Sequence, residues 1–170
     1  MISLLGDKTQ WLAALAKASP PGPIMEVGVY MGGSAEVLYK VASEQGRALY
    51  LYDTFTGIPH KDPIDSHNVG DFSGGLSFSA TMEGFPEAIV QDGIFPRTQF
   101  IPEEIAFVHL DVDQYRSYRE SLDALIPKMV KGGMIVCDDY CLDGAKKAID
   151  ETEGTKIPLP DGRMMFVFHS

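Results

Sequence analysis

The sequence predicts an α/β fold, a single domain over residues 1–170 built on a mainly parallel sheet. Three observations support this prediction. Apolar, β-branched runs alternate with segments of helical periodicity, which is typical of β-α-β units. Several apolar runs end abruptly at aspartate, as buried parallel strands do at a functional edge. A chain of 170 residues also fits one domain with a sizeable core.

The first elements follow from periodicity and chain breakers. Lys8–Ala18 carries apolar residues at helical spacing and is expected to be a short N-terminal helix. A proline-rich stretch breaks the chain after it. We then expect a strand at Ile24–Val27, a helix at Ser34–Glu44 and a strand at Ala48–Tyr52.

A polar, glycine-rich segment, Thr54–Ser79, shows little periodicity. Loops of this length inside a compact domain are usually functional lids or partly disordered. A short helix at Ala80–Gly84 and a short strand at Glu87–Gln91 are expected after it.

The second half continues the alternation and ends in a hairpin. Strands four and five are joined by one crossover helix, so we expect them to be neighbours. The expected elements are a strand at Ile105–Leu110, a helix ending near Ile126, a strand at Met134–Cys137, a helix at Leu142–Glu151, and a hairpin of Lys156–Leu159 with Met164–Phe168.

The charge balance excludes some partners. Acidic residues outnumber basic ones by 24 to 14, which argues against a nucleic-acid or anionic-membrane surface. No apolar run approaches the roughly 18 residues of a membrane span, and the N-terminus lacks a signal-peptide pattern. We therefore expect a cytoplasmic protein in which Cys137 and Cys141 are free thiols.

Two pairs of aspartates follow the fourth and fifth predicted strands, Asp111 with Asp113 and Asp138 with Asp139. Four carboxylates brought together would repel one another, and a divalent cation with a preference for hard oxygen ligands would relieve this. Consecutive residues cannot share one face of a strand, so Asp138 and Asp139 converge only if the strand ends there. We predict an ion on Asp111, Asp138 and Asp139, with Asp113 free. The alternative is solvated carboxylates that cap the next helices.

The turn after the first strand, Glu26–Ser34, lies where nucleotide-type cofactors bind. Tyr30 replaces the glycine that admits a pyrophosphate, and Glu26 favours a cationic ligand. S-adenosylmethionine therefore fits better than NAD, with Asp53 placed to bind its ribose. The alternatives are a plain tight turn with Ser34 as helix cap, and a turn aspartate at Asp53. The expected cofactor contacts are Glu26, Gly28, Tyr30, Gly33, Ser34, Asp53, Thr54, Gly93 and Asp111.

The histidines favour structural interpretations. His109 lies within a predicted buried strand and is expected to be a hydrogen-bonded core residue. His60 and His67 lie in the long polar segment, where solvated side chains are the simpler expectation, although substrate contact stays open.

Taken together, these motifs resemble the class I S-adenosylmethionine-dependent methyltransferases of the TylF-like (macrocin O-methyltransferase) family. The matching pieces run in order from Glu26 to the C-terminal hairpin. They are EVGVYMGGS, YDTFTGIP, GDFS, FSAT, QDGIFPRT, FVHLDVDQYRS and LIPKMVKGGMIVCDDY. The family usually has threonine where this chain has Tyr118.

The resemblance implies a Rossmann-like, doubly wound, seven-stranded sheet and methyl transfer to a hydroxyl of a sugar or other small molecule. It also implies Mg²⁺, with Mn²⁺ or Ca²⁺ as substitutes, on Asp111, Asp138 and Asp139. Asp113 would then be the base, since coordination to a dication lowers the pKa of an alcohol enough for a carboxylate to deprotonate it.

Other interpretations stay open at this point. The segment before Glu26 is shorter than in family members and the helix after FSAT looks truncated, which leaves a non-catalytic cofactor-binding or assembly module as an alternative. A nicotinamide-dependent oxidoreductase fits Glu26 and Tyr30 less well. A homodimer that completes the acceptor side is a further hypothesis.

Overall fold

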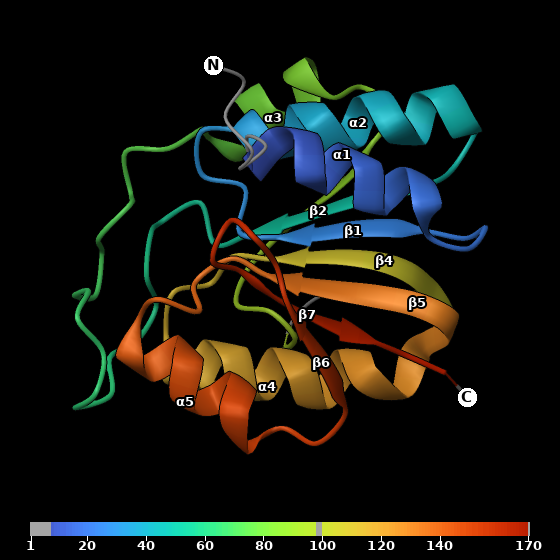
Figure 1. The fold of residues 1–170 in the computed structure, drawn as a ribbon. Coiled ribbons are helices and arrows are strands. Elements are labelled where there is room, and N and C mark those ends of the chain that lie inside the picture. The colour runs from blue at the N-terminus through green and yellow to red at the C-terminus, as the bar shows by residue number, and fades with distance from the viewer. Residues whose placement is uncertain (1–7, 98–99, 170) are drawn as a thin grey trace, which may run out of the picture.

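The computed structural model describes residues 8–97 and 100–169, which form a seven-stranded sheet between two layers of helices (Figure 1). The strand order is β3-β2-β1-β4-β5-β7-β6. Strands β1 to β5 pair in parallel, whereas β7 is antiparallel to both β5 and β6. The predicted Rossmann-like, mainly parallel sheet with a C-terminal antiparallel hairpin is therefore confirmed.

The strands are β1 (Ile24–Val27), β2 (Leu49–Asp53), β3 (Ile89–Asp92), β4 (Ile105–Leu110), β5 (Met129–Cys137), β6 (Thr155–Pro158) and β7 (Met164–Val167). The helices are α1 (Lys8–Ala18), α2 (Gly33–Gln45), α3 (Phe78–Gly84), α4 (Tyr115–Leu125), the 3-10 turn η1 (Ile126–Lys128) and α5 (Asp143–Glu151). None of the helices in the described ranges is long and apolar enough to cross a bilayer.

Most predicted elements lie within one or two residues of the observed ones, and β5 differs most. It begins at Met129 rather than Met134, because the chain stays paired with β4 through a register shift between Ile105 and Phe107. Gly132 takes a left-handed φ of 79° within this stretch, so the first half of β5 is irregular. Helix α3 begins earlier than predicted because Ser77 caps it, accepting from the Ala80 N–H.

Two apolar layers hold the sheet. One packs alternate strand residues such as Val108 and Leu110 against α4 and α5, and the other packs Phe107 and its neighbours against α1 and α2 (Figure 1). Because side chains alternate along a strand, Glu26 and His109 face the α1/α2 layer. Both are buried.

The carboxyl ends of β1, β4 and β5 meet at one edge of the sheet. Val27 is in register with Leu110, and Leu110 with Cys137. Backbone bonds continue this pairing for one more residue, from Asp111 N to Val27 O and from Asp138 N to Leu110 O. The glycine turn and both pairs of aspartates therefore lie side by side.

Candidate active site

A cavity opens at this edge of the sheet, between the glycine turn and the loop that follows β2. Six of the nine predicted cofactor contacts line it: Gly28, Tyr30, Asp53, Thr54, Gly93 and Asp111. The other three, Glu26, Gly33 and Ser34, do not line it. The turn and the ends of three strands thus converge on one hollow, as expected of an α/β ligand site.

Gly28 is required by the fold of the turn. Its φ is 94°, and a Cβ atom at this position would lie 1.9 Å from the backbone oxygen of Asp111. A side chain here would force β1 away from the segment that carries the aspartates. The glycine therefore keeps the turn and Asp111 in direct contact.

Asp53 stabilises the same turn. One carboxylate oxygen accepts from the N–H groups of Val29 at 2.7 Å and Tyr30 at 3.1 Å, and the other accepts from Phe55 at 2.8 Å. These bonds are those expected if Asp53 is a turn aspartate, which is the alternative to ribose binding. Two oxygens offer about four acceptor positions, so one remains for a ribose hydroxyl and the cofactor role stays a prediction.

Glu26 lies behind the turn and has no exposed surface. Its Oε1 is 2.8 Å from Nδ1 of His109, which confirms His109 as a hydrogen-bonded core residue. The second oxygen, Oε2, is buried without a hydrogen-bond partner among the described residues. In this arrangement Glu26 binds the core residue His109 and does not line the cavity, and its contact with the cofactor stays a prediction.

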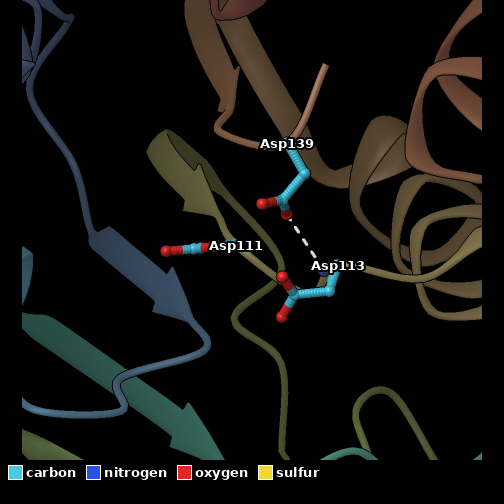
Figure 2. Close-up of side chains that lie close together, drawn as sticks. All are labelled: Asp111, Asp113 and Asp139. Atoms are coloured by element: carbon cyan, nitrogen blue, oxygen red, sulfur yellow. Dashed lines mark hydrogen bonds between the residues drawn. The ribbon is translucent and has the colours of Figure 1, made fainter. Parts of the chain in front are cut away.

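Three carboxylates gather beside the cavity, those of Asp111, Asp113 and Asp139 (Figure 2). One oxygen from each lies within 4.8 Å of the others. Asp113 adopts a left-handed φ of 59°, and its N–H donates to Oδ2 of Asp139 at 2.9 Å. The positive φ turns the chain after β4, so Asp113, three positions beyond the end of that strand, can reach Asp139 at the end of β5.

Burial raises the pKa of each member of this cluster, and the charge of at least one neighbouring aspartate adds to the effect. Burial and the charges of Asp139 and Asp138 raise the pKa of Asp113 to about 7. Burial and the charge of Asp139 raise the pKa of Asp111 well above its ordinary value. Burial likewise raises the pKa of Asp139. Such a cluster of hard oxygen donors has the chemistry that a divalent cation favours.

Tyr118 of α4 binds the carboxylate of Asp139. Its hydroxyl is fully buried and lies 2.8 Å from Oδ2 of Asp139 and 2.8 Å from the oxygen of Leu110. It also accepts the N–H of Asp139 at 3.2 Å. Tyr118 therefore fixes the carboxylate of Asp139 against β4.

Asp138 lies apart from this cluster. The predicted metal set contained Asp138, whereas the observed cluster contains Asp113 in its place. Its carboxylate is 3.0 Å from Lys8 Nζ, 3.5 Å from His109 Nε2 and 3.6 Å from Arg163 Nη1. Burial acts to raise the pKa of Asp138, but the hydrogen bonds and charges of His109 and Lys8 hold it well below its usual value. Burial acts to lower the pKa of His109, and its carboxylate partners raise it to about 10.

Asp138 points away from the cluster because side chains alternate between the two faces of a strand. The backbone of Asp138 still pairs with Leu110, so the strand geometry continues through this residue. Consecutive side chains then point to opposite faces, Asp138 toward the α1/α2 layer and Asp139 toward α4. The structure thus brings together Asp111, Asp113 and Asp139, and it does not bring Asp138 to them.

The segment 54–77 covers the cavity and is held by the start of α4. Four consecutive residues, 114–117, each bind one residue of the loop. The bonds are Gln114 Nε2 to His67 O at 3.1 Å, Tyr115 N to Asp65 Oδ1 at 2.8 Å, Arg116 Nη2 to Asp62 Oδ1 at 3.0 Å, and Ser117 Oγ to His60 Nε2 at 3.1 Å.

The expectation of solvated loop histidines is therefore not met. Burial lowers the pKa of His60, which bonds to Ser117. His67 lies 3.8 Å from Oδ1 of Asp113, and its ring contacts Phe72 edge-on at 5.0 Å. No local pattern signals the contact of His60 with Ser117 or that of His67 with Asp113, because these partners lie about fifty positions away along the chain.

Comparisons with known proteins agree with this architecture. A family model described as "Methyltransferase domain" matches residues 25–140. The chain is 27% identical over 156 residues to 8-demethyl-8-(2,3-dimethoxy-alpha-L-rhamnosyl)-tetracenomycin-C 4'-O-methyltransferase of Streptomyces olivaceus, covering 79% of this chain and 59% of that protein. It is 23% identical over 152 residues to mycinamicin III 3''-O-methyltransferase of Micromonospora griseorubida, covering 77% and 60%. The chain thus spans about three fifths of the length of these curated relatives.

Solved structures show the same fold. The O-methyltransferase NovP superposes with a TM-score of 0.76 at 20% identity, covering 96% of this chain and 80% of NovP. The calicheamicin methyltransferase CalS11 gives 0.74 at 18% identity, covering 95% and 77%.

Proposed function

The chain belongs to the family of methyltransferase domains, and we propose that it is an S-adenosylmethionine-dependent O-methyltransferase of small hydroxylated molecules. The acceptor would be a hydroxyl of a sugar or a natural-product-type compound, because the curated relatives are named for such reactions. One observation carries the proposal. Asp111 and Asp113 open into the same cavity as Gly28 and Tyr30, so a donor and an acceptor would meet there.

The cofactor residues would be those of the turn and the strand ends. Gly28, Tyr30, Asp53, Thr54 and Gly93 line the cavity, and the Asp53 carboxylate accepts three backbone hydrogen bonds out of about four possible ones. S-adenosylmethionine would supply the methyl group. A dinucleotide is less favoured because Tyr30 occupies the place where a pyrophosphate needs glycine.

The acidic cluster fits a divalent cation such as Mg²⁺, or Mn²⁺ or Ca²⁺ in its place. The fit rests on three oxygens within 4.8 Å of one another and on the raised pKa values of their carboxyls. Asp111 and Asp139 belong both to this cluster and to the set implied by the resemblance. The third ligand would be Asp113 if the side chains stay as they are, or Asp138 if it leaves Lys8. A bound dication would lower the pKa of the acceptor hydroxyl.

The chain's own residues would then do three things. Asp113, at the cavity wall, would take the proton from the acceptor hydroxyl if Asp111, Asp138 and Asp139 hold the ion and leave Asp113 free. Asp139 would orient Asp113, because the backbone N–H of Asp113 donates to the Asp139 carboxylate at 2.9 Å. The loop held by residues 114–117 would exclude water from the reaction.

Calorimetry with S-adenosylhomocysteine, with and without Mg²⁺, tests the proposal. Binding at micromolar concentrations followed by methylation of a hydroxylated acceptor would support it. No binding at millimolar ligand would exclude a methyltransferase. Binding without methylation of any acceptor would favour the non-catalytic module instead, and sedimentation would test the predicted homodimer.

A further inference from the structure

Asp138 lies among three basic side chains on the α1/α2 side of the sheet. Its Oδ2 atom is 3.0 Å from Nζ of Lys8. Its Oδ1 atom is 3.5 Å from Nε2 of His109 and 3.6 Å from Nη1 of Arg163. Asp138 belongs to the metal set that the sequence predicts, so the groups that hold it here also keep it from that set.

Two of the three basic side chains have a closer carboxylate than Asp138. Nδ1 of His109 is 2.8 Å from Oε1 of Glu26, and Nη2 of Arg163 is 2.6 Å from Oδ2 of Asp161. Both His109 and Arg163 are buried. If Asp138 turned away, each would keep its nearest counter-ion, so no buried positive charge would be left unpaired.

Lys8 differs from these two residues. Asp138 is its only ion-pair partner among residues 8–97 and 100–169, and its side chain is 51% exposed. Water can therefore solvate the ammonium group when the pair separates. The backbone of Lys8 stays in place, because its oxygen accepts from Nη2 of Arg163 at 2.8 Å. Lys8 is thus a counter-ion that can be exchanged without undocking α1.

Asp138 is also placed where its side chain can turn. It is the first residue beyond β5, and its side chain is 20% exposed. A change of rotamer redirects the carboxylate while the backbone bond from its N–H to the oxygen of Leu110 remains. Its neighbour Asp139 lies in the acidic cluster with Asp111. A dication carries twice the charge of an ammonium group, so the two would compete for this one carboxylate.

We propose that Lys8 is a positioning residue that competes with the divalent cation for Asp138, an inference that rests on the proposed function. In the metal-free protein the ammonium group neutralises Asp138 and holds it against α1. Asp138 leaves Lys8 when Asp111 and Asp139 hold the ion, and Asp113 is then free as the base. The ion pair between Lys8 and Asp138 therefore sets the cation concentration at which the site is assembled.

Calorimetric titration with Mg²⁺ on the full chain at constant ionic strength tests the competition. Lys8→Met removes the charge but keeps an apolar stem, and should tighten Mg²⁺ binding about three- to fivefold, which is the contribution of an exposed ion pair. Lys8→Arg keeps the charge and should stay within about twofold of wild type. Lys17→Met is the matched control, because Lys17 lies on the same helix, is 50% exposed and pairs with Glu44. It should leave the affinity for Mg²⁺ unchanged.

NMR of the lysine ammonium groups gives a second measurement, made on the wild-type chain. The Lys8 signal is identified by its loss in Lys8→Arg. On addition of Mg²⁺ it should move toward the chemical shift of a solvated lysine, whereas the Lys17 signal should stay where it is.

Unchanged or weaker Mg²⁺ binding in Lys8→Met would show that the ion pair only anchors α1, and would overturn the inference. Equal tightening in Lys17→Met, a Lys8 signal that is the same at saturating Mg²⁺, or no Mg²⁺ binding to wild type would overturn it as well. Each of these results leaves the methyltransferase proposal intact if S-adenosylhomocysteine still binds. Failure of S-adenosylhomocysteine to bind wild type would instead exclude the methyltransferase without altering the Mg²⁺ result.

Discussion

The N–H of Asp113 donates to Oδ2 of Asp139 at 2.9 Å, which links the proposed base to a proposed metal ligand through a backbone bond (Figure 2). The bond holds Asp113 in its left-handed conformation. Because Tyr118 fixes the same carboxylate oxygen, the position of Asp113 depends on a buried residue of α4 as well as on its own turn.

The membership of the metal set can be tested by three matched variants. Asp139→Asn should weaken Mg²⁺ binding by more than about tenfold, the loss that even an outer partner of a metal ligand can cause. If the cluster binds the ion as it stands, Asp113→Asn should weaken binding similarly and Asp138→Asn should not. Calorimetric titration with Mg²⁺ measures all three. A large loss in Asp138→Asn alone would instead show that Asp138 leaves Lys8 to join the ion.

The raised pKa of Asp113 predicts a pH dependence of stability in metal-free protein. The native carboxyl holds its proton up to about pH 7, whereas in the unfolded chain it loses the proton near its ordinary value. The native state therefore binds more protons between these limits, and the free energy of unfolding falls as pH rises through them.

Asp113→Asn should remove this contribution. The slope of the free energy of unfolding between pH 5 and 6.5 should become less negative by up to about 1.4 kcal/mol per pH unit. Urea unfolding in the presence of a chelator at several pH values measures it. Identical slopes in the variant and wild type would mean that Asp113 is not the group that retains the proton.

A substitution of Glu26 tests whether this residue stabilises the core or binds the cofactor. Glu26→Gln removes the charge beside buried His109, so the free energy of unfolding should fall by about 2–3 kcal/mol. Affinity for S-adenosylhomocysteine should change less than about threefold. Exposed Glu153→Gln serves as the control for both measurements. A stable variant that binds the cofactor poorly would instead support the contact predicted from sequence.

Asp65 anchors the loop to α4 and is buried. Asp65→Ala leaves the N–H of Tyr115 without its acceptor and should cost about 1–2 kcal/mol, as the loss of a helix cap does. Amide hydrogen exchange should accelerate across residues 54–77, while the strands keep their protection. Asp123→Ala, an exposed change on the same helix, is the control. Unchanged hydrogen exchange in the loop would show that the other three bonds from residues 114–117 are enough to hold it in place.

Much of the fold is predictable because the strands are apolar and end at acidic residues. The pairing of β4 with β5, and hence the approach of Asp111 to Asp139, follows from one crossover helix between them. The position of Asp138 is not predictable in this way. Its partner Lys8 is 130 positions away, and the face it takes depends on whether the strand ends at residue 137 or one residue later.

The loop contacts escape prediction for a related reason. A polar segment without periodicity looks solvated when read alone, and only the folded chain shows that residues 114–117 bind it. His67 therefore has a place beside Asp113 that its neighbours in sequence do not signal.

Asp65 also affects whether an anionic ligand can bind at the amino end of α4. The amino end of a helix at a strand edge is where α/β proteins commonly bind phosphate, through free backbone N–H groups. In this chain the carboxylate of Asp65 already accepts from Tyr115 there, and Gly144 of α5 leaves it room. A phosphorylated compound would have to displace the Asp65 carboxylate to use that end of α4, so the amino end of this helix is not a free phosphate site.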